Sequence, residues 1–333
     1  MQVLVTGGGG FLGRYIVEQL LERGDEVTSF SPGRHSELKD LGATTIQGDL
    51  RDAAAVDRAV RGQEIVFHVA AKAGFWGAWA AYYGPNVTGA ENVIAACRAH
   101  GVKKLVYTSS PSVVFDNQPQ SGVDESYPFP ARYESFYPHT KAIAEQKVIA
   151  ANGPNLATCA LRPHLIFGPR DNHLLPRIIA TAQAGRLPQV GDGTNKVDLT
   201  YVEDAARAHL LAGDRLEPGS PVAGSIYFIS QDEPVLLWQW LGALFEQLGI
   251  PPVKHHFSLG LARLAGGAME LAYKTLKLGG EPRLTRFLAS ELALDHYYDI
   301  SRAKRDLGYR PQIDMTKATQ RTIEYLTEKM YSK

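Results

Sequence analysis

The chain has 333 residues, 35 of them basic and 35 acidic, so its formal net charge is zero. That balance excludes the basic footprint with which nucleic-acid-binding domains attract phosphates, and we expect no nucleic-acid partner. Two cysteines, Cys97 and Cys159, are too few for a disulfide framework or a cysteine cluster, and we predict no metal site. The length allows one large domain or two modest ones.

The distribution of apolar residues predicts a soluble, cytoplasmic protein. Met1 runs directly into an apolar strand, without the basic segment and cleavage site of a signal peptide. No stretch approaches the roughly 18 uncharged apolar residues of a membrane span. The nearest one, 259–278, is leucine-rich but carries four charged residues. We interpret it as an apolar lid over the substrate or, alternatively, as a surface helix that touches a membrane.

The first half of the chain alternates short apolar runs with helical stretches. Strands are expected at 3–5, 26–30, 44–47, 65–69, 105–108 and 156–161, and helices at 11–23, 52–60, 87–100 and 138–151. Strands that are apolar throughout and joined by helices are typical of a parallel sheet covered on both faces. The sequence therefore predicts an α/β, Rossmann-type, doubly wound domain over residues 1–168.

The second half loses this rhythm. Proline and glycine punctuate residues 168–193, a late strand is expected at 225–229, and the remainder is mostly helical. We expect residues 169–333 to form a smaller, mostly helical substrate-binding part against the C-terminal edge of the sheet. The two parts interleave, since about 196–213 is expected to return to the Rossmann domain.

A glycine-rich turn follows the first strand. Gly7, Gly10 and Gly13 are spaced as Gly-x-x-Gly-x-x-Gly before the first helix. Such glycines allow a tight turn and let backbone N–H groups approach a pyrophosphate at the helix N-terminus. Directly after a strand in a βαβ unit, this pattern predicts a dinucleotide-binding site.

The end of the second strand distinguishes the two nicotinamide cofactors. NAD sites normally carry a carboxylate there, which binds the ribose 2′-hydroxyl. This chain has Ser31 instead, with Arg34 nearby and no acidic residue before Glu37. A guanidinium matches phosphate oxygens, so we favour NADP(H) over NAD(H), although Arg34 as an ordinary exposed loop residue is the alternative. Asp49, after the third strand, is placed to accept a hydrogen bond from the adenine amine.

Three polar residues predict carbonyl chemistry. Tyr137 and Lys141 lie four residues apart at the start of a helix and share one face. A tyrosine with a pKa near ~10 is a poor base, but a neighbouring ammonium and the nicotinamide ring favour the phenolate. Ser110 would hold the substrate oxygen, with Ser109 and Ser112 as competing candidates. Lys141 can also bind the nicotinamide ribose.

These motifs resemble the extended short-chain dehydrogenase/reductase superfamily. Its further motifs are present as His68-Val69-Ala70-Ala71, Asn86-Val87-Thr88-Gly89 and the stretch 162–169. The stretches 171–176, 296–298 and 307–309 look like the 3β-hydroxysteroid dehydrogenase branch. The segment 71–77 is similar to the bacterial 2-alkyl-3-oxoalkanoate reductases of olefin biosynthesis, which use NADPH.

The resemblance implies reduction of the 3-keto group of a 2-alkyl-3-oxoalkanoic acid, with Ser110, Tyr137 and Lys141 as the catalytic residues. It also implies a homodimer formed through the helices at 87–100 and 138–151. The cofactor site is expected to include Phe11, Leu12, Leu50, Ala70, Ala71, Pro163 and Ile166 as well.

The substrate is expected to be a small apolar carboxylic acid. Lys72 and His173 are candidates for binding its carboxylate, and Trp76 and Trp79 for lining an apolar channel. A sterol-4-carboxylate 3-dehydrogenase is the main alternative, because its substrate also carries an oxygen on the carbon β to a carboxylate. A sugar-nucleotide epimerase or dehydratase and a non-catalytic NADP-binding regulator are weaker alternatives.

Overall fold

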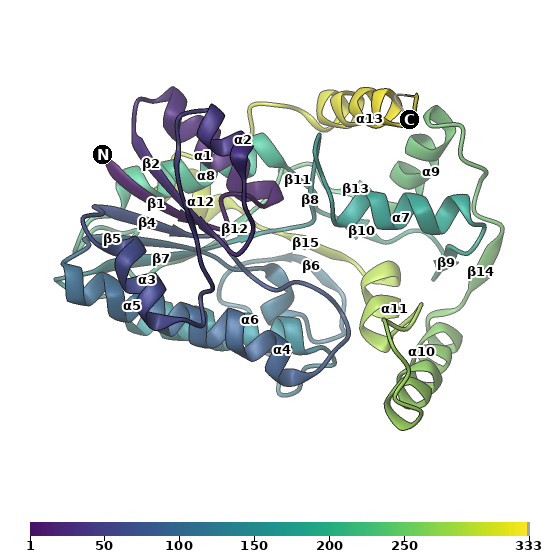
Figure 1. Cartoon of the computed structure of the whole chain (residues 1–333). Coiled ribbons are helices and arrows are strands. Elements are labelled where there is room, and N and C mark those ends of the chain that lie inside the picture. Colours follow the sequence, from purple (N-terminus) through teal and green to yellow (C-terminus); the bar gives the residue numbers. More distant parts are fainter. Residues whose placement is uncertain (332–333) are drawn as a thin grey trace.

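The main body of the molecule is a seven-stranded parallel sheet with helices on both faces, as Figure 1 shows. This computed structural model describes residues 1–331. The strand order is β12-β7-β5-β4-β1-β2-β3. The strands are β1 (Gln2–Thr6), β2 (Glu26–Ser31), β3 (Thr44–Gln47), β4 (Ile65–His68), β5 (Lys104–Thr108), β7 (Ala157–Pro163) and β12 (Ile226–Ile229). The predicted doubly wound, Rossmann-type fold is confirmed.

Apolar side chains point from the sheet into two separate cores. Val3 and Val5 of β1 lie in one core and Leu4 between them lies in the other, so both faces of the strand are buried. On one face α1 packs against α8, and on the other α3 and α6 pack against α5. These helices are α1 (Phe11–Glu22), α3 (Ala53–Val60), α5 (Gly89–His100), α6 (Phe136–Ala150) and α8 (Val202–Arg215). Burial on both faces explains why the strands are apolar throughout.

The strand order reverses beside β1, which pairs in parallel with β2 on one side and with β4 on the other. The glycine turn leaves the carboxyl end of β1, and the segment beginning at His68 leaves the carboxyl end of β4. Ligands of open α/β sheets bind in the crevice at such a switch point.

The smaller part contains short strands and most of the remaining helices. A second sheet has the strand order β13-β10-β15-β6, and two further pairs join β11 to β8 and β14 to β9.

The remaining elements of the whole molecule, in chain order, are α2 (Ser36–Asp40), α4 (Trp79–Tyr83), the π-helix η1 (Gly84–Thr88), the 3₁₀-helix η2 (Pro111–Val114), β6 (Gln120–Val123), β8 (Ile166–Phe167), α7 (Leu174–Gln183), β9 (Pro188–Val190), β10 (Lys196–Val197), β11 (Thr200–Tyr201), β13 (Val235–Leu236), α9 (Leu237–Gln247), β14 (His255–Phe257), α10 (Leu259–Thr275), α11 (Arg286–Ala293), β15 (His296–Tyr298), α12 (Ser301–Asp306) and α13 (Met315–Tyr331).

Two segments from the second half of the chain belong to the main body. Helix α8 packs on α1, and β12 pairs in parallel with β7 at the edge of the seven-stranded sheet. The sequence analysis expected a strand at 225–229 but did not assign it to this sheet. The reason is that a short apolar run indicates a buried strand, whereas the strand with which it pairs is not visible in the sequence.

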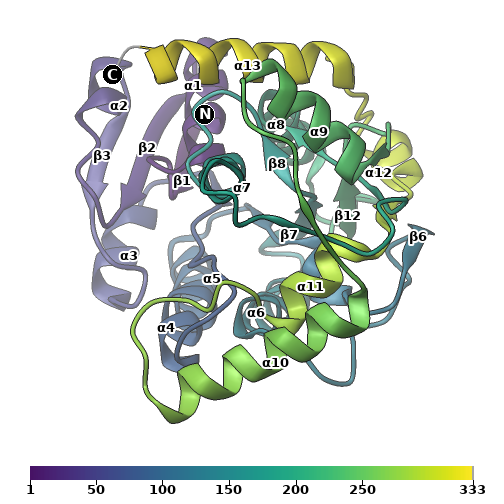
Figure 2. The same ribbon diagram turned by 90° about the vertical axis from the view of Figure 1, so that its right-hand side faces the viewer.

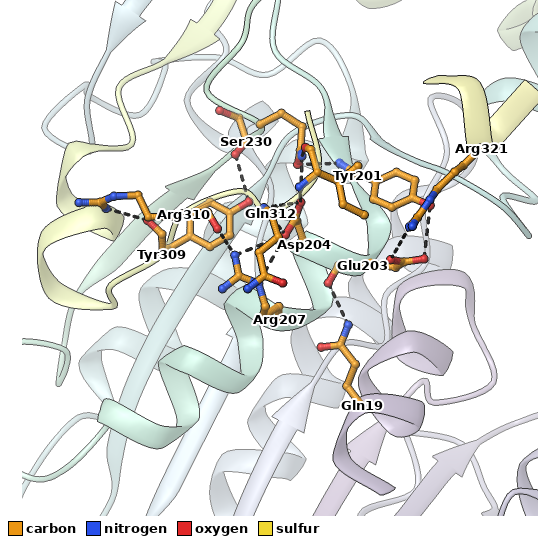
Figure 3. Close-up of polar contacts among 12 residues, drawn as sticks. Gln19, Tyr201, Glu203, Asp204, Arg207, Ser230, Tyr309, Arg310, Gln312 and Arg321 are labelled. Atoms are coloured by element: carbon orange, nitrogen blue, oxygen red, sulfur yellow. Dashed lines mark hydrogen bonds and ion pairs between the residues drawn. The ribbon is translucent and has the colours of Figure 1, made fainter. Parts of the chain in front are cut away.

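A buried carboxylate joins the C-terminal region to the main body, as Figure 3 shows. Asp204, in the first turn of α8, accepts hydrogen bonds from the backbone N–H of Gln312 at 3.0 Å and from the side chain of Gln231 at 3.0 Å. The Tyr309 hydroxyl donates to the Ser230 carbonyl at 3.1 Å. These bonds fix the segment that leads into α13 against α8. Within the described residues, no helix combines the length and the apolar character needed to cross a bilayer.

Candidate active site

A cleft of about 830 Å³ opens at the carboxyl ends of the main-sheet strands. It is lined by residues from the glycine turn, from the ends of β2, β3, β4, β5 and β7, and from the start of α6. Sixteen residues predicted for the site line it: Gly7, Gly10, Phe11, Leu12, Gly13, Ser31, Asp49, Leu50, Ala70, Ala71, Lys72, Ser110, Tyr137, Pro163, Ile166 and His173. Lys141, Arg34, Trp76 and Trp79 lie outside this lining.

The glycine turn is packed so closely that no side chain fits at two of its positions. Gly7 has a φ of +74°, and a Cβ there would lie 2.8 Å from the Cα of Ala70. A Cβ on Gly13 would lie 2.1 Å from the carbonyl oxygen of Gly7. Helix α1 begins after Gly10, which has no side chain to cap the first N–H groups. The bare backbone beside the cleft therefore fits the pyrophosphate of a dinucleotide.

The end of β2 presents a small hydroxyl to the cleft. Ser31 is 5% exposed, and its Oγ accepts a hydrogen bond from the Gly9 N–H at 3.4 Å. Arg34, predicted to bind a 2′-phosphate, is exposed and donates from Nε to Gln47 Oε1 at 3.3 Å. Its side chain is therefore directed toward β3 in this structure.

His35 occupies the position beside the cleft that the sequence analysis gave to Arg34. A Cβ on Gly9 would lie 2.1 Å from His35 Nε2, so the imidazole packs directly on the glycine turn. Its Nδ1 lies 3.1 Å from the carboxylate of Glu37. The sequence analysis did not select His35 as a site residue, because the direction in which a loop side chain points depends on the tertiary structure.

The end of the cleft beside β3 carries an ion pair. Arg51 donates to Asp49 through Nε at 3.0 Å and through a terminal nitrogen at 2.5 Å. Hydrogen bonds from Arg51 hold the pKa of Asp49 below its usual range. Arg51 also lines the cleft and was not predicted as a site residue. Leu50 packs on Gly89, where a Cβ would lie 2.8 Å from the Leu50 Cβ.

Ser110 and Tyr137 meet at the cleft from different elements. Ser110 follows β5, and Tyr137 lies in the first turn of α6. Burial raises the pKa of Tyr137, and a hydrogen bond with Ser110 acts in the opposite direction. The Oγ atoms of Ser110 and Ser112 lie 2.8 Å apart, while the buried hydroxyl of Ser109 has no partner among the described residues. Ser110 is therefore the serine that contacts the tyrosine.

Lys141 lies beneath the cleft and is only 2% exposed. Its Nζ donates to the Thr108 carbonyl at 2.5 Å and lies 4.1 Å from the ring centroid of Tyr107. Burial lowers the pKa of Lys141 to about 7, opposed by the charge of Glu145. The expected lowering of the Tyr137 pKa by this ammonium is absent here, because burial of the phenol dominates and the ammonium faces Thr108.

Asn86 fastens the segment after β4 to α6. Its side chain accepts from the Lys72 N–H at 2.7 Å and donates to the Lys72 carbonyl at 3.1 Å. It also donates to the Thr140 hydroxyl at 3.0 Å. Because Thr140 lies between Tyr137 and Lys141 on α6, these bonds hold the cleft wall in a fixed position relative to α6.

The predicted substrate residues divide into two groups. Lys72 and His173 line the cleft. The Trp76 ring instead meets Tyr273 of α10 edge-on, with centroids 6.3 Å apart, and the Trp79 ring lies 5.0 Å from His139 of α6. Trp76 connects the loop after β4 to α10, and Trp79 connects α4 to α6. The predicted contact of the two tryptophans with substrate stays a prediction.

Residues 4–260 match the 3-beta hydroxysteroid dehydrogenase/isomerase family. The chain belongs to this family. It is 47% identical over 323 residues to a 2-alkyl-3-oxoalkanoate reductase of Stenotrophomonas maltophilia, covering 96% of this chain and 98% of that protein. It is 34% identical to the mouse sterol-4-alpha-carboxylate 3-dehydrogenase (decarboxylating), covering 96% and 89% of the two chains.

The structural comparison agrees on the fold. A dTDP-glucose 4,6-dehydratase from Streptomyces venezuelae superposes with a TM-score of 0.78 at 24% identity, covering 100% of this chain and 98% of that one. At this identity the likeness shows the extended short-chain dehydrogenase/reductase fold alone. Together with the family, the named relatives establish an oxidoreductase that acts on CH–OH or C=O groups.

Proposed function

We propose that this protein uses NADPH to reduce the 3-keto group of a 2-alkyl-3-oxoalkanoic acid to the hydroxyl. The observation that carries the proposal is the meeting of Ser110 and Tyr137 in the same cleft as the glycine turn. The proposal is supported by the 47% identity to a 2-alkyl-3-oxoalkanoate reductase, in an alignment that covers nearly the whole of both chains.

Ser110, Tyr137 and Lys141 have different roles in the proposed reduction. A bound nicotinamide would supply the hydride. Ser110 holds the substrate oxygen by a hydrogen bond, and Tyr137 donates its phenolic proton to that oxygen as negative charge develops there. A raised tyrosine pKa suits this direction, because the resting phenol is then protonated and ready to donate. Lys141 would bind the ribose hydroxyls of that cofactor if its ammonium turned from the Thr108 carbonyl toward the cleft.

The preference for the phosphorylated cofactor is assigned to the end of β2. Ser31 leaves room where a carboxylate would repel a 2′-phosphate. His35 packs on the glycine turn at the edge of the cleft, so we assign it the nearest phosphate contact, with Arg34 as the outer cation. The carboxylate of Glu37 lies 3.1 Å from the Nδ1 atom of His35 and holds the imidazole in this position.

Tyr137→Phe tests the assignment of the acid. The variant should bind NADPH as the native protein does, while turnover falls by at least about 100-fold, the usual contribution of a positioned acid. Tyr133→Phe is the matched control, because its hydroxyl donates to the Val113 carbonyl at 2.8 Å and does not line the cleft. Turnover retained in Tyr137→Phe would exclude this tyrosine as the proton donor.

A sterol-4-carboxylate 3-dehydrogenase is the second candidate. The observation that favours it is the 34% identity to the mouse enzyme of that name over most of both chains. In either substrate the reacting oxygen lies β to a carboxylate, for which Lys72 and His173 in the cleft are the proposed partners.

A further inference from the structure

Exposed large hydrophobic side chains gather on one segment. Of the ten in the described part of the chain, six lie between Phe257 and Leu278. Leu264 is 72% exposed, Leu276 69% and Leu271 63%. Scattered single apolar residues are normal on a surface, but a contiguous group marks a contact with something else.

The inner face of α10 packs against other parts of the protein. Ala262 and Gly266 are buried, and a Cβ on Gly266 would lie 2.7 Å from the backbone of Thr285 before α11. Arg263 pairs with Glu134 at 2.7 Å, which joins the helix to the loop before α6. Figures 1 and 2 show α10 at the edge of the molecule, far from α13 and beyond α11.

The outer face of α10 is an apolar stripe. Leu261, Leu264, Ala268 and Leu271 are all exposed, and their spacing of three, four and three residues places them along one side of the helix. Leu276 and Leu278 continue the apolar surface beyond the helix end. We call these six residues the α10 stripe.

The charge around the stripe is positive, although the whole chain is neutral. Residues 254–283 contain five basic and two acidic residues. Both carboxylates are neutralised, Glu270 by Arg286 and Glu281 by Arg177. Four exposed cations make no ion pair with any described residue: Lys254, Lys274, Lys277 and Arg283.

We propose that the α10 stripe docks on an anionic lipid surface, with its leucines in the interface and these four cations at the headgroups. Exposed leucines along one side of a helix, with unpaired cations in the same segment of the chain, are typical of an interfacial helix. Helix α10 has 17 residues and is about 25 Å long, so it can lie flat on a bilayer.

The inner contacts of α10 link this surface to the cleft. Tyr273 of α10 meets the ring of Trp76 in the loop after β4. Glu281, in the segment that follows α10, pairs with Arg177 of α7. Docking would therefore place the entrance for a long-chain substrate at the lipid surface. This consequence rests on the proposed function, whereas lipid binding itself does not.

The test is co-sedimentation of the full chain with phosphatidylcholine vesicles, with and without phosphatidylglycerol. We expect binding to the anionic vesicles that weakens with salt. Leu264→Ser with Leu271→Ser should lower it by at least about tenfold, given the apolar area lost. Lys274→Gln with Lys277→Gln should lower it roughly fivefold per charge. Leu41→Ser, which changes another exposed leucine, and Lys39→Gln with Lys317→Gln are matched controls and should bind as the native chain does.

Equal binding by the stripe variants and the controls, or no binding to anionic vesicles, would overturn the proposal. So would a native dimer that the leucine pair converts to monomer while vesicle binding is unchanged, because the stripe would then be a protein interface. Turnover of a short, water-soluble 2-alkyl-3-hydroxy acid should be the same in the stripe variants and the native chain. Vesicle binding without any such turnover would contradict the proposed function and leave the docking surface intact.

Discussion

Replacing His35 with alanine tests how the proposed NADPH site recognises a 2′-phosphate. The imidazole packs on the glycine turn, lines the cleft and lies 3.1 Å from the carboxylate of Glu37. Its side chain is 26% exposed, so a phosphate contact there is only partly screened by water. The variant should lose this contact and keep the rest of the dinucleotide site.

The expected effect is that of one charge-assisted hydrogen bond. Such bonds contribute about 1.5–3 kcal/mol, which corresponds to a rise in the NADPH dissociation constant of roughly 10- to 150-fold. NADH lacks the phosphate, so its dissociation constant should change little. Arg34→Ala should raise the value for NADPH less than His35→Ala does, because Arg34 is exposed and turned toward Gln47.

Nucleotide fluorescence measures both dissociation constants without a substrate, so the test is independent of turnover. His35→Gln is a control that keeps a hydrogen-bond donor and removes the imidazole ring, and it should give an intermediate loss. Equal losses of NADPH and NADH binding would refute the reasoning, as would an effect confined to Arg34→Ala.

Two further predictions concern buried ionisable side chains on α6. Burial lowers the pKa of Lys141 from 10.5 to about 7, so the unfolded chain binds more protons between these values and this group makes stability rise with pH across that window. Lys141→Met should remove that slope in urea unfolding at pH 7 and pH 9, and an unchanged slope would contradict the assignment. Arg162 and Glu145 form an ion pair at 2.6 Å with side chains 2% and 0% exposed. Arg162→Met should therefore cost about 3–5 kcal/mol of unfolding free energy, and the double variant with Glu145→Met should recover most of it. Equal stability of the single and double variants would show that an unpaired carboxylate is not the cause.

The fold was predictable because a strand that is buried on both faces of a sheet is apolar at every position. Val3, Leu4 and Val5 are all apolar because successive side chains enter opposite cores. Ser110 and Tyr137 were expected to act together because of the resemblance to the extended short-chain dehydrogenase/reductases, and both side chains line the cleft. The glycine spacing predicted a turn that admits no side chain, and the structure shows why.

The features that sequence reasoning missed depend on tertiary contacts. His35 and Arg34 are neighbours in one loop, and only the fold decides which side chain packs on the glycine turn. The pKa values of Lys141 and Tyr137 follow from burial, which the spacing of four residues does not reveal. The same holds for Trp79, which packs on α6. The homodimer through the helices at 87–100 and 138–151 stays a prediction.

The central claim is tested most directly by following NADP⁺ reduction by the purified protein. The assay offers a long-chain 2-alkyl-3-hydroxyalkanoic acid or a 4-carboxysterol, with NAD⁺ in parallel. Running the oxidation avoids the β-keto acid, which decarboxylates spontaneously. We predict turnover of the acyl substrate and a preference for NADP⁺. Turnover of the sterol alone with NAD⁺ would contradict both the proposed substrate and the role given to the end of β2.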